Sequence, residues 1–184
     1  RASKVWDNAD QYVVDIKQSG QFLLDIINDI LDLSRIESGR YELYPERYDL
    51  ISLIHQVCRR FNQPLSEKAM NLELPSKSAV LEVFGDRRAT QQILINLLTN
   101  AMKYSGRGTE VKVTVLQQDD DRVEVKIADN GAGVPKAKLA QIMEPFVQIS
   151  SSYARPAGGT GLGLAICRSL ARAITAELPH STWW

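Results

Sequence analysis

The feature of this chain that most constrains its fold is an amphipathic segment at residues 86–105, DRRATQQILINLLTNAMKYS. Its apolar residues recur three and four positions apart, which predicts a helix with one face committed to a core; they are Ile93, Leu94, Leu97, Leu98 and Ala101. Asp86 stands in the position of an N-cap. Asn96 and Asn100 lie one turn apart on the other face, although asparagine is a poor residue for a helix interior. Taken alone, this helix would simply have a solvated face there.

Two glycine-rich loops follow further along the chain. Asp129 opens the first loop, DNGAG, directly after an alternating strand, and the second loop, GGTGLGL at residues 158–164, opens another helix. Glycine lets backbone amides close around an anion, and a helix start adds partial positive charge, so the second loop is suited to phosphate. The Asp129 carboxylate could accept a hydrogen bond from the amino group of a base. The helix and both loops in this order favour a nucleotide site over a solvated helix face.

These residues resemble the ATP-binding domain of sensor histidine kinases, part of a wider group with gyrase, the heat-shock chaperone ATPases and the mismatch-repair ATPases. The resemblance reaches nearly to Ala173 and rests on four boxes: NLLTNAMKY at residues 96–104 (N box), DNGAGVP at 129–135 (G1 box), EPF at 144–146 (F box) and GTGLGLAI at 159–166 (G2 box). It implies an α+β fold of the Bergerat type, an α/β sandwich in which a mixed sheet packs on helices, preceded by a long helix of a helical-bundle dimerisation domain. It also implies ATP and Mg2+ as cofactors and phosphoryl transfer to a histidine.

Composition narrows the class of protein. The chain has 184 residues, 44% of them hydrophobic, which suits one domain of ordinary size plus an appendage. Lysine plus arginine and aspartate plus glutamate both number 22, so no excess of positive charge attracts nucleic acid, which we exclude as a partner. Cys58 and Cys167 stand among helical apolar residues without a metal or redox motif, which predicts reduced core thiols. With no signal peptide and no apolar run of about 18 residues, we expect a cytoplasmic location for this piece, even if its parent is anchored in a membrane.

The amino-terminal segment predicts a long helix at residues 10–35. Its seam alternates at three and four positions, as in helices that pack against other helices, and consists of Val13, Ile16, Gly20, Leu23, Ile27 and Ile30. The segment resembles the second helix of the histidine-kinase dimerisation domain, which assigns residues 1–40 to that region and implies a homodimer through residues 10–37. The first helix, which carries the phosphoacceptor histidine in the family, has no counterpart here. His55 and His180 lack that setting, and we interpret them as a core-edge residue and a tail residue.

The ATP-binding domain is assigned to residues 41–175 and an irregular tail to residues 176–184. Patterning predicts strands at residues 41–48, 71–74, 79–84, 110–116 and 122–128, and helices at 50–68, 136–143 and 162–175. Residues 144–159 form a long segment of little periodicity between two nucleotide loops, which predicts an ATP lid with Phe146 packing at its base. The tail is too short for the two strands that follow in the family, which predicts an open sheet edge.

The resemblance also assigns nucleotide-binding residues. Asn100 is assigned to Mg2+, because an amide oxygen is a hard ligand suited to a metal that already holds phosphate oxygens and water. Asn96 would support the phosphates or their waters, and Asp129 would accept the hydrogen bond of the adenine amino group. The other assigned residues approach the base, line the lid, or offer charge, amides and a hydroxyl to the triphosphate: Lys103, Tyr104, Gly131, Gly133, Phe146, Thr160, Gly161, Leu162 and Gly163. No catalytic residue is assigned within this chain, because the base for transfer comes from the first dimerisation helix.

The predicted function is the ATP-binding catalytic part of a two-component sensor histidine kinase. It would transfer the γ-phosphate of Mg-ATP to a histidine on a dimerisation helix not present in this chain, with a response-regulator receiver domain as a further partner, and the chain alone would not autophosphorylate. Two alternatives stay open: an ATP-binding scaffold or phosphotransfer adaptor without turnover, and a hydrolytic ATPase of the same superfamily. Hydrolysing members carry glutamate where Asn96 stands, and asparagine cannot act as a general base. A serine-kinase relative shares the boxes, but the dimerisation-like helix disfavours it.

Overall fold

A computed structural model describes residues 9–118, 122–148 and 159–177. The helices in this part of the chain are α2 (Ala9–Glu37), α3 (Leu50–Cys58), α4 (Asn62–Glu67), α5 (Arg87–Tyr104) and α6 (Gly163–Glu177), with short 3-10 turns η1 (Arg59–Phe61), η2 (Lys136–Lys138) and η3 (Gln141–Met143). None of these helices combines the length and the apolar content needed to cross a membrane.

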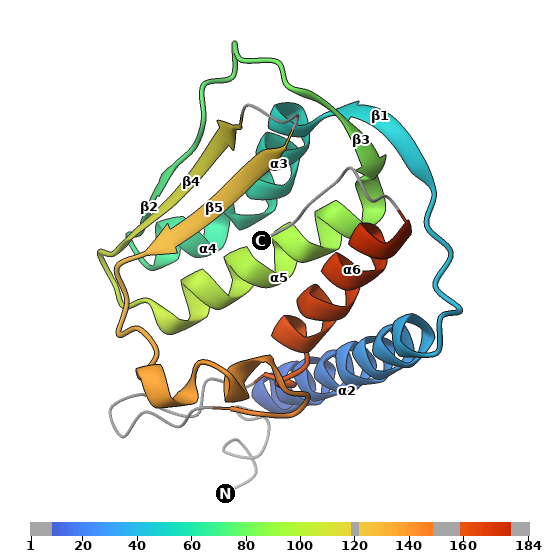
Figure 1. The fold of residues 1–184 in the computed structure, drawn as a ribbon. Helices are drawn as coiled ribbons and strands as arrows, with labels where there is room; N and C mark the ends of the chain where they lie inside the picture. Colours follow the sequence, from blue (N-terminus) through green and yellow to red (C-terminus); the bar gives the residue numbers. More distant parts are fainter. Residues whose placement is uncertain (1–8, 119–121, 149–158, 178–184) are drawn as a thin grey trace, which may run out of the picture.

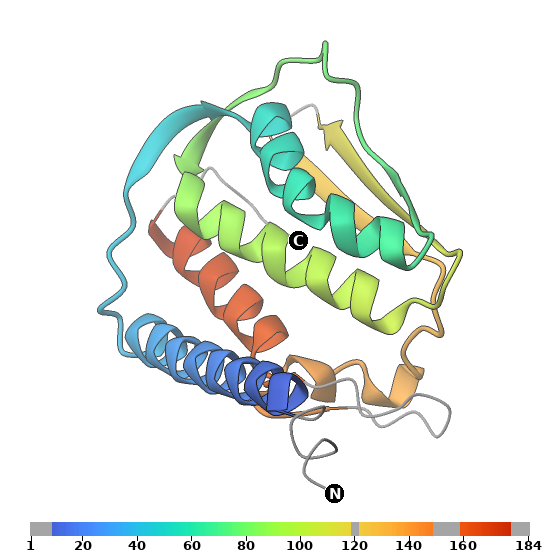
Figure 2. The ribbon, with the colours of Figure 1, turned by 180° about the vertical axis from the view of Figure 1, so that it is seen from behind.

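The strands form two small sheets. The first is a mixed sheet in which β4 (Glu110–Gln117) runs parallel to β2 (Asn71–Glu73) and antiparallel to β5 (Val123–Asp129). The second is an antiparallel pair of β1 (Pro45–Asp49) and β3 (Glu82–Asp86). The mixed sheet lies over one side of α3, α4 and α5, which the opposed views of Figures 1 and 2 show. This arrangement confirms the predicted α+β fold with a mixed sheet packed on helices.

The main hydrophobic core fills the space between the mixed sheet and the helices. Val111 and Val113 of β4 are buried on the helix-facing side of the sheet, as the alternating pattern predicts. Leu94, Leu98 and Ala101 of α5 are buried against them in the same cluster. The amphipathic pattern of residues 86–105 therefore does set the orientation of α5, and its asparagine-bearing face lies away from this core.

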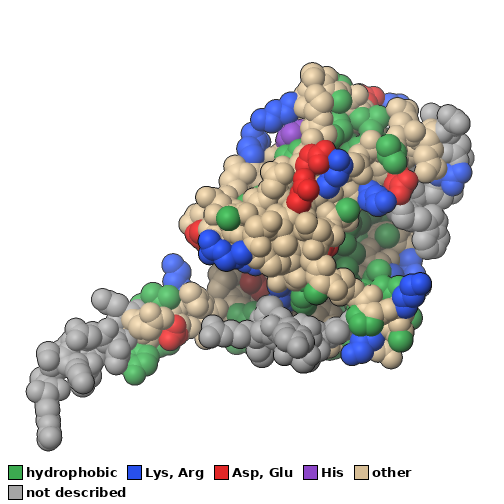
Figure 3. Space-filling view, turned by 90° about the vertical axis from the view of Figure 1, so that its left-hand side faces the viewer, with side chains coloured by type: hydrophobic (Ala, Val, Ile, Leu, Met, Phe, Trp, Pro, Cys, Tyr) green, Lys and Arg blue, Asp and Glu red, His purple; other side chains and the backbone are tan. Residues whose placement is uncertain are grey.

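A second hydrophobic core joins α2 to the rest of the molecule. Helix α6 lies between α5 and α2 and contacts both (Figures 1 and 2). The residues of this second core come from α2, α5, α6 and the loop before α6: Leu33, Ile36, Ala89, Leu162, Ile166, Leu170 and Ile174. The amino-terminal part of α2 projects from the body as an arm with hydrophobic side chains on its surface, at the lower left of Figure 3.

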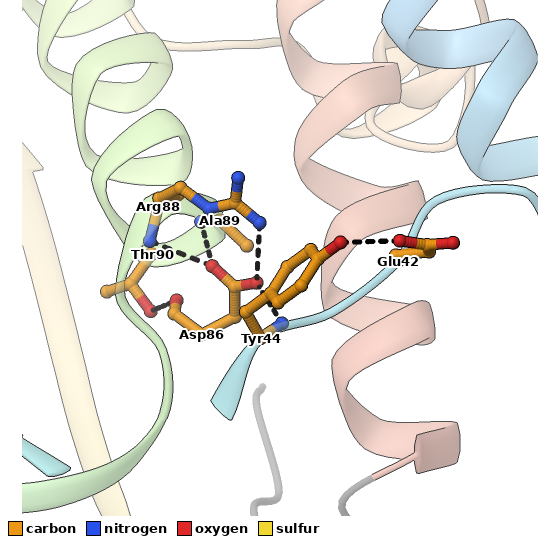
Figure 4. Close-up of polar contacts among 6 residues, drawn as sticks. All are labelled: Glu42, Tyr44, Asp86, Arg88, Ala89 and Thr90. Atoms are coloured by element: carbon orange, nitrogen blue, oxygen red, sulfur yellow. Dashed lines mark hydrogen bonds and ion pairs between the residues drawn. The ribbon is translucent and has the colours of Figure 1, made fainter. Parts of the chain in front are cut away.

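Asp86 is the N-cap of α5, and its side chain also forms a hydrogen bond with the segment that follows α2 (Figure 4). The side chain is 1% exposed, and its Oδ1 accepts hydrogen bonds from the amides of Arg88 (2.8 Å) and Ala89 (2.9 Å), as an N-cap does. Its Oδ2 accepts a third bond from the amide of Tyr44 at 2.7 Å. The predicted N-cap is confirmed, and it also anchors the connection between α2 and β1.

Several predicted boundaries were wrong. The helix expected at residues 50–68 is divided into α3, η1 and α4, because Pro64 lacks an amide proton and its ring clashes with the preceding turn of a continuous helix. The strands expected at 41–48 and 79–84 begin only at Pro45 and Glu82. Residues 41–44 run as an irregular segment instead, since Tyr41 and Leu43 pack on the second core. The helix expected at 136–143 is two separate 3-10 turns.

The cysteines and His55 lie where the sequence predicts. Cys58 and Cys167 are free and buried, and burial raises the thiol pKa of Cys58 to about 11 and that of Cys167 to about 12. His55 is half-buried at the edge of the core, with its Nε2 2.9 Å from the carbonyl oxygen of Pro75. His180, most of the predicted lid (residues 149–158) and most of the predicted tail (residues 178–184) lie outside the described residues. Residues 176–177, predicted to begin the irregular tail, belong to α6 instead.

Candidate functional site

The first part of the site lies where β5 ends. Asp129 pairs with Val111 in the antiparallel register, and Ile127 pairs with Val113. Directly paired residues in a sheet project to the same face, so Asp129 is on the helix-facing side with the buried valines. Its Oδ1 accepts hydrogen bonds from the Ser105 hydroxyl (3.1 Å) and from the Gly131 amide (2.9 Å). Within the described residues both of these bonds fall on Oδ1, and the Asp129 residue is exposed.

Gly131 packs tightly against the carboxyl end of α5. A Cβ atom on this residue would lie 2.7 Å from Asp129 Oδ1, 2.9 Å from the Tyr104 carbonyl oxygen and 3.0 Å from Ser105 Oγ. No larger residue fits without moving these atoms. The close approach of Gly131 is thus to the end of α5, and its predicted approach to a base stays a prediction. Gly133 has a positive φ of +68° and open space around its Cα.

The second part of the site lies about two turns earlier on the same helix. The Asn96 side chain donates a hydrogen bond from Nδ2 to the carbonyl oxygen of Gly163, the first residue of α6, at 3.3 Å. The carboxyl end of α5 therefore contacts the loop at Asp129, and Asn96 contacts the start of α6. Asn96 and Ser105 are nine residues apart, which corresponds to about 13 Å along the helix axis.

Asn100 lies between these two contacts. Residues four apart share a helix face, so Asn96, Asn100 and Tyr104 form one row along α5. Asn100 is half-buried and Tyr104 is half-exposed. The Lys103 ammonium lies 5.2 Å from the centroid of the Tyr104 ring, at the carboxyl end of the helix, where a cation is favourable.

The loop before α6 is also held from α2. The Thr160 hydroxyl donates a hydrogen bond to Asp29 Oδ2 at 2.9 Å and accepts one from the Leu162 amide at 3.0 Å. Leu162 itself is fully buried in the second core. Desolvation by burial raises the pKa of Asp29, and the hydrogen bond from Thr160 partly offsets this rise. The hydroxyl and amide predicted to face a triphosphate are therefore engaged with each other and with α2.

Phe146 and Gly161 hold each other in unusual conformations. Phe146 has φ +63° and Gly161 has φ +72°, and the Phe146 amide donates to the Gly161 carbonyl oxygen at 3.0 Å. A Cβ atom on Gly161 would lie 2.9 to 3.2 Å from three backbone atoms of Phe146. Phe146 is 63% exposed, and most of the lid at whose base it is predicted to pack lies outside the described residues. It borders a cavity of about 430 Å3 whose other lining residues belong to α2 and its end: Ile30, Leu33, Ser34, Glu37 and Ser38.

Known proteins share both the boxes and the fold. The family described as histidine kinase-, DNA gyrase B- and HSP90-like ATPases matches residues 85–182. This chain belongs to that family. An uncharacterized sensor-like histidine kinase of Rhizobium meliloti is 39% identical over 165 residues, 90% of this chain and 31% of the relative. The chain spans less than a third of the length of the curated relatives it matches.

Solved histidine kinases have the same fold. Full-length ShkA, crystallised in complex with AMPPNP, superposes with a TM-score of 0.73 at 31% identity, covering 89% of this chain and 34% of ShkA. ThkA, solved in complex with the response regulator TrrA, superposes with a TM-score of 0.65 at 24% identity, covering 87% of this chain and 43% of ThkA, which shows a shared fold. The chain thus contains the ATP-binding catalytic domain of a sensor histidine kinase.

No group of three or more histidine, cysteine or acidic side chains in the described part of the chain could hold a metal ion by itself. Mg2+ commonly takes one or two protein ligands and completes its shell with phosphate oxygens and water. The Asn100 amide in the middle of the row is suited to be such a ligand.

Sequence reasoning missed two residues of the site. Ser105 donates a hydrogen bond to the Asp129 carboxylate, and the only hint of this in the sequence is its position at the end of the predicted helix. Asp29 reaches Thr160 across 131 sequence positions, and no local pattern marks such a contact. Both are polar residues on predicted helices, and a polar residue on a helix usually just faces solvent.

Proposed function

We propose that this chain binds Mg-ATP along the row Asn96, Asn100 and Tyr104 and transfers the γ-phosphate to a histidine on a separate dimerisation helix. The observation that carries the proposal is that α5 contacts both glycine-rich loops, at Gly163 and at Asp129. A single elongated ligand between these contacts meets a carboxylate at one end and a glycine-rich helix start at the other. Adenine at the carboxylate and phosphates at the helix start match the chemistry of each end.

The residues have distinct roles in this proposal. Asp129 accepts a hydrogen bond from the adenine amino group with Oδ2, while Gly131 and Gly133 let the backbone approach the base. Asn100 binds Mg2+, and Lys103 supplies positive charge. The loop at Thr160, Gly161, Leu162 and Gly163 surrounds the phosphates. Asn96 holds this loop in place through Gly163.

The proposed reaction is phosphoryl transfer by positioning and charge neutralisation. The bond from the γ-phosphorus to the bridging oxygen of ADP breaks, and a bond to a ring nitrogen of the acceptor histidine forms. The imidazole proton passes to a carboxylate beside that histidine on the acceptor helix. Mg2+ supplies charge compensation on the phosphate oxygens when it is bound.

The domain boundaries belong to the same proposal. Residues 1–40 would be the second helix of the dimerisation region, and residues 41–175 the ATP-binding domain. The anchoring of Tyr44 by Asp86 supports a boundary near residue 41, because the chain meets the main body there. A response-regulator receiver domain is the proposed recipient of the phosphoryl group, as ThkA was solved with the response regulator TrrA.

Hydrolysis of ATP is the less favoured activity. A hydrolase needs a general base beside the γ-phosphate, and the side chain at the corresponding position is Asn96, which donates to a backbone carbonyl. The purified chain should therefore release little phosphate from ATP without an acceptor. A scaffold without turnover would differ from a kinase by failing to transfer phosphate.

Transfer to an added acceptor tests the proposal. The full chain is incubated with labelled Mg-ATP and a separate dimerisation domain that carries its histidine, and acid-labile phosphate on that domain is measured. We expect labelling by the wild-type chain and its loss in Asn100→Ala and Asp129→Ala. Asn71→Ala, which changes an exposed amide on β2, is the matched control and should keep the activity. Labelling that survives in both site variants would contradict the proposal.

A further inference from the structure

The loop proposed to hold the phosphates is in contact with α2 through two kinds of interaction. The Asp29 carboxylate accepts the hydrogen bond of the Thr160 hydroxyl at 2.9 Å. Two residues further on, Leu162 is fully buried in the core that Leu33 and Ile36 of α2 share. The position of α2 and the conformation of this loop are therefore linked.

The Thr160 hydroxyl can donate one hydrogen bond, and it donates that bond to Asp29. Its oxygen is also engaged, because it accepts the Leu162 amide at 3.0 Å. Phosphate oxygens at neutral pH are hydrogen-bond acceptors, so a triphosphate at Thr160 would compete for the hydrogen bond that the hydroxyl donates to Asp29. Thr160 cannot donate to Asp29 and to a phosphate oxygen with the same proton. The two acceptors compete.

Charge strengthens this competition. Asp25, Asp29 and Asp32 are spaced four and three residues apart, so they follow one face of α2. Asp25 and Asp32 both act on Asp29 as like charges. A triphosphate brought to Thr160 would meet the negative charge of Asp29 in a half-buried place, where screening by water is weaker than at the surface.

We propose that Asp29 is a positioning residue through which α2 competes with the triphosphate of ATP for the Thr160 hydroxyl. This inference rests on the proposed nucleotide site. Docked α2 lowers the affinity of the loop for nucleotide, and bound nucleotide loosens α2 from the loop by the same factor, because coupling between two binding equilibria is reciprocal. The contact lets the dimerisation helix and the phosphate loop respond to each other.

The test measures the affinity for Mg-AMPPNP by calorimetry on the full chain. Asp29→Asn removes the charge and keeps a similar shape, and Asp29→Ala removes the acceptor as well. We expect the Kd to fall by about fivefold or more in both variants, at the lower end of measured couplings between sites. Asp15→Asn removes an exposed carboxylate from the same helix and should leave the Kd unchanged.

A double-mutant cycle separates competition at Thr160 from a general effect on the fold. Thr160→Val removes the contested hydroxyl, so adding Asp29→Asn or Asp29→Ala to it should tighten binding by less than the same change does in the wild type. Hydrogen exchange gives a second readout: Mg-AMPPNP should speed exchange of the α2 amides at residues 26–36 in the wild type. Thermal melting verifies that each variant is folded.

The outcomes distinguish this inference from the proposed function. A folded wild-type chain that binds no Mg-AMPPNP would refute the nucleotide site itself. A wild-type chain that binds while Asp29→Asn and Asp29→Ala bind equally well or more weakly would overturn the competition alone. Unchanged or slower exchange in α2 on binding would also overturn it.

Discussion

At the scale of single residues, Gly161 has little freedom to change. Its φ of +72° favours glycine, and its Cα approaches the Phe146 backbone, which has a positive φ as well. The hydrogen bond from the Phe146 amide to the Gly161 carbonyl closes this contact. The sequence EPF and the sequence GTGLG thus fit each other through their backbones.

Replacing Gly161 by alanine tests this contact. Gly161→Ala should destabilise the fold by about 3 kcal/mol, because the unfavourable backbone conformation adds to a clash with Phe146. Gly108→Ala is the matched control, since Gly108 has φ +70° with open space around its Cα, and should lose only about 1 kcal/mol. Urea unfolding measures both. Equal losses would show that the approach to Phe146 carries no energy.

At the scale of elements, Asp49 and Asp86 are both helix N-caps, but they accept hydrogen bonds from different neighbouring segments. Asp49 caps α3 through the amides of Ile51 and Ser52 and also accepts the Leu81 amide. Asp86 caps α5, is almost fully buried and accepts the amide of Tyr44. In both places an aspartate begins a helix and fixes a neighbouring segment, but Asp86 is buried whereas Asp49 is half-buried.

Removal of each cap should have a different effect. Asp86→Ala leaves three amides without a partner, one of them buried and two partly buried, and should lower the free energy of unfolding by about 3 kcal/mol, whereas Asp49→Ala should lose about 1 kcal/mol. Urea unfolding at neutral pH compares them. An effect of Asp49→Ala equal to that of Asp86→Ala would contradict the role of Asp86 in anchoring Tyr44.

The Asp49 cap also predicts a pH dependence. The hydrogen bond from the Ser52 side chain is the main cause that lowers the pKa of Asp49 below its usual 3.8. A carboxyl with a lowered native pKa stabilises the fold above its unfolded value, and this stabilisation is lost as pH falls through the native value. Asp49→Ala should therefore lose less stability than the wild type on acidification below about pH 4. An identical acid profile would contradict the cap.

Local patterning accounts for the elements that the sequence could predict. The apolar spacing of α5, the valine alternation of β4 and β5 and the two glycine-rich loops are each encoded within about twenty residues. The division of the helix at residues 50–68 depended on Pro64, whose effect on the turn before it was not recognised. The contact between Asp29 and Thr160 depends on how α2 packs on α6, which no local pattern reports. The same holds for Ser105 and its bond to Asp129.

At the scale of the whole molecule, α2 has one side in the second core and another in solvent. Leu33 and Ile36, near its carboxyl end, are buried. Ile16 is 72% exposed and Leu23 is 57% exposed, and their spacing of seven residues puts them on one face of α2. Exposed apolar surface of this extent is typical of a protein interface.

The exposed seam predicts self-association. We expect the wild-type chain to form a dimer through residues 10–37, and the double variant Ile16→Glu with Leu23→Glu to be a monomer, because four carboxylates would enter the apolar interface. Gln18→Glu adds a charge to the same helix outside the seam and should remain dimeric. Sedimentation velocity over a range of concentrations measures the state. A wild-type chain that stays monomeric throughout, or a dimer that survives the double variant, would contradict this prediction.

The central claim is that α5 and its two glycine-rich loops bind one magnesium nucleotide, and a crystal structure of this chain with AMPPNP and Mg2+ tests it most directly. We predict the adenine amino group within hydrogen-bonding distance of Asp129 Oδ2 and Mg2+ at about 2.1 Å from the Asn100 side-chain oxygen. Nucleotide bound elsewhere, for example in the cavity between Phe146 and α2, with Asp129 and Asn100 unchanged, would contradict the claim.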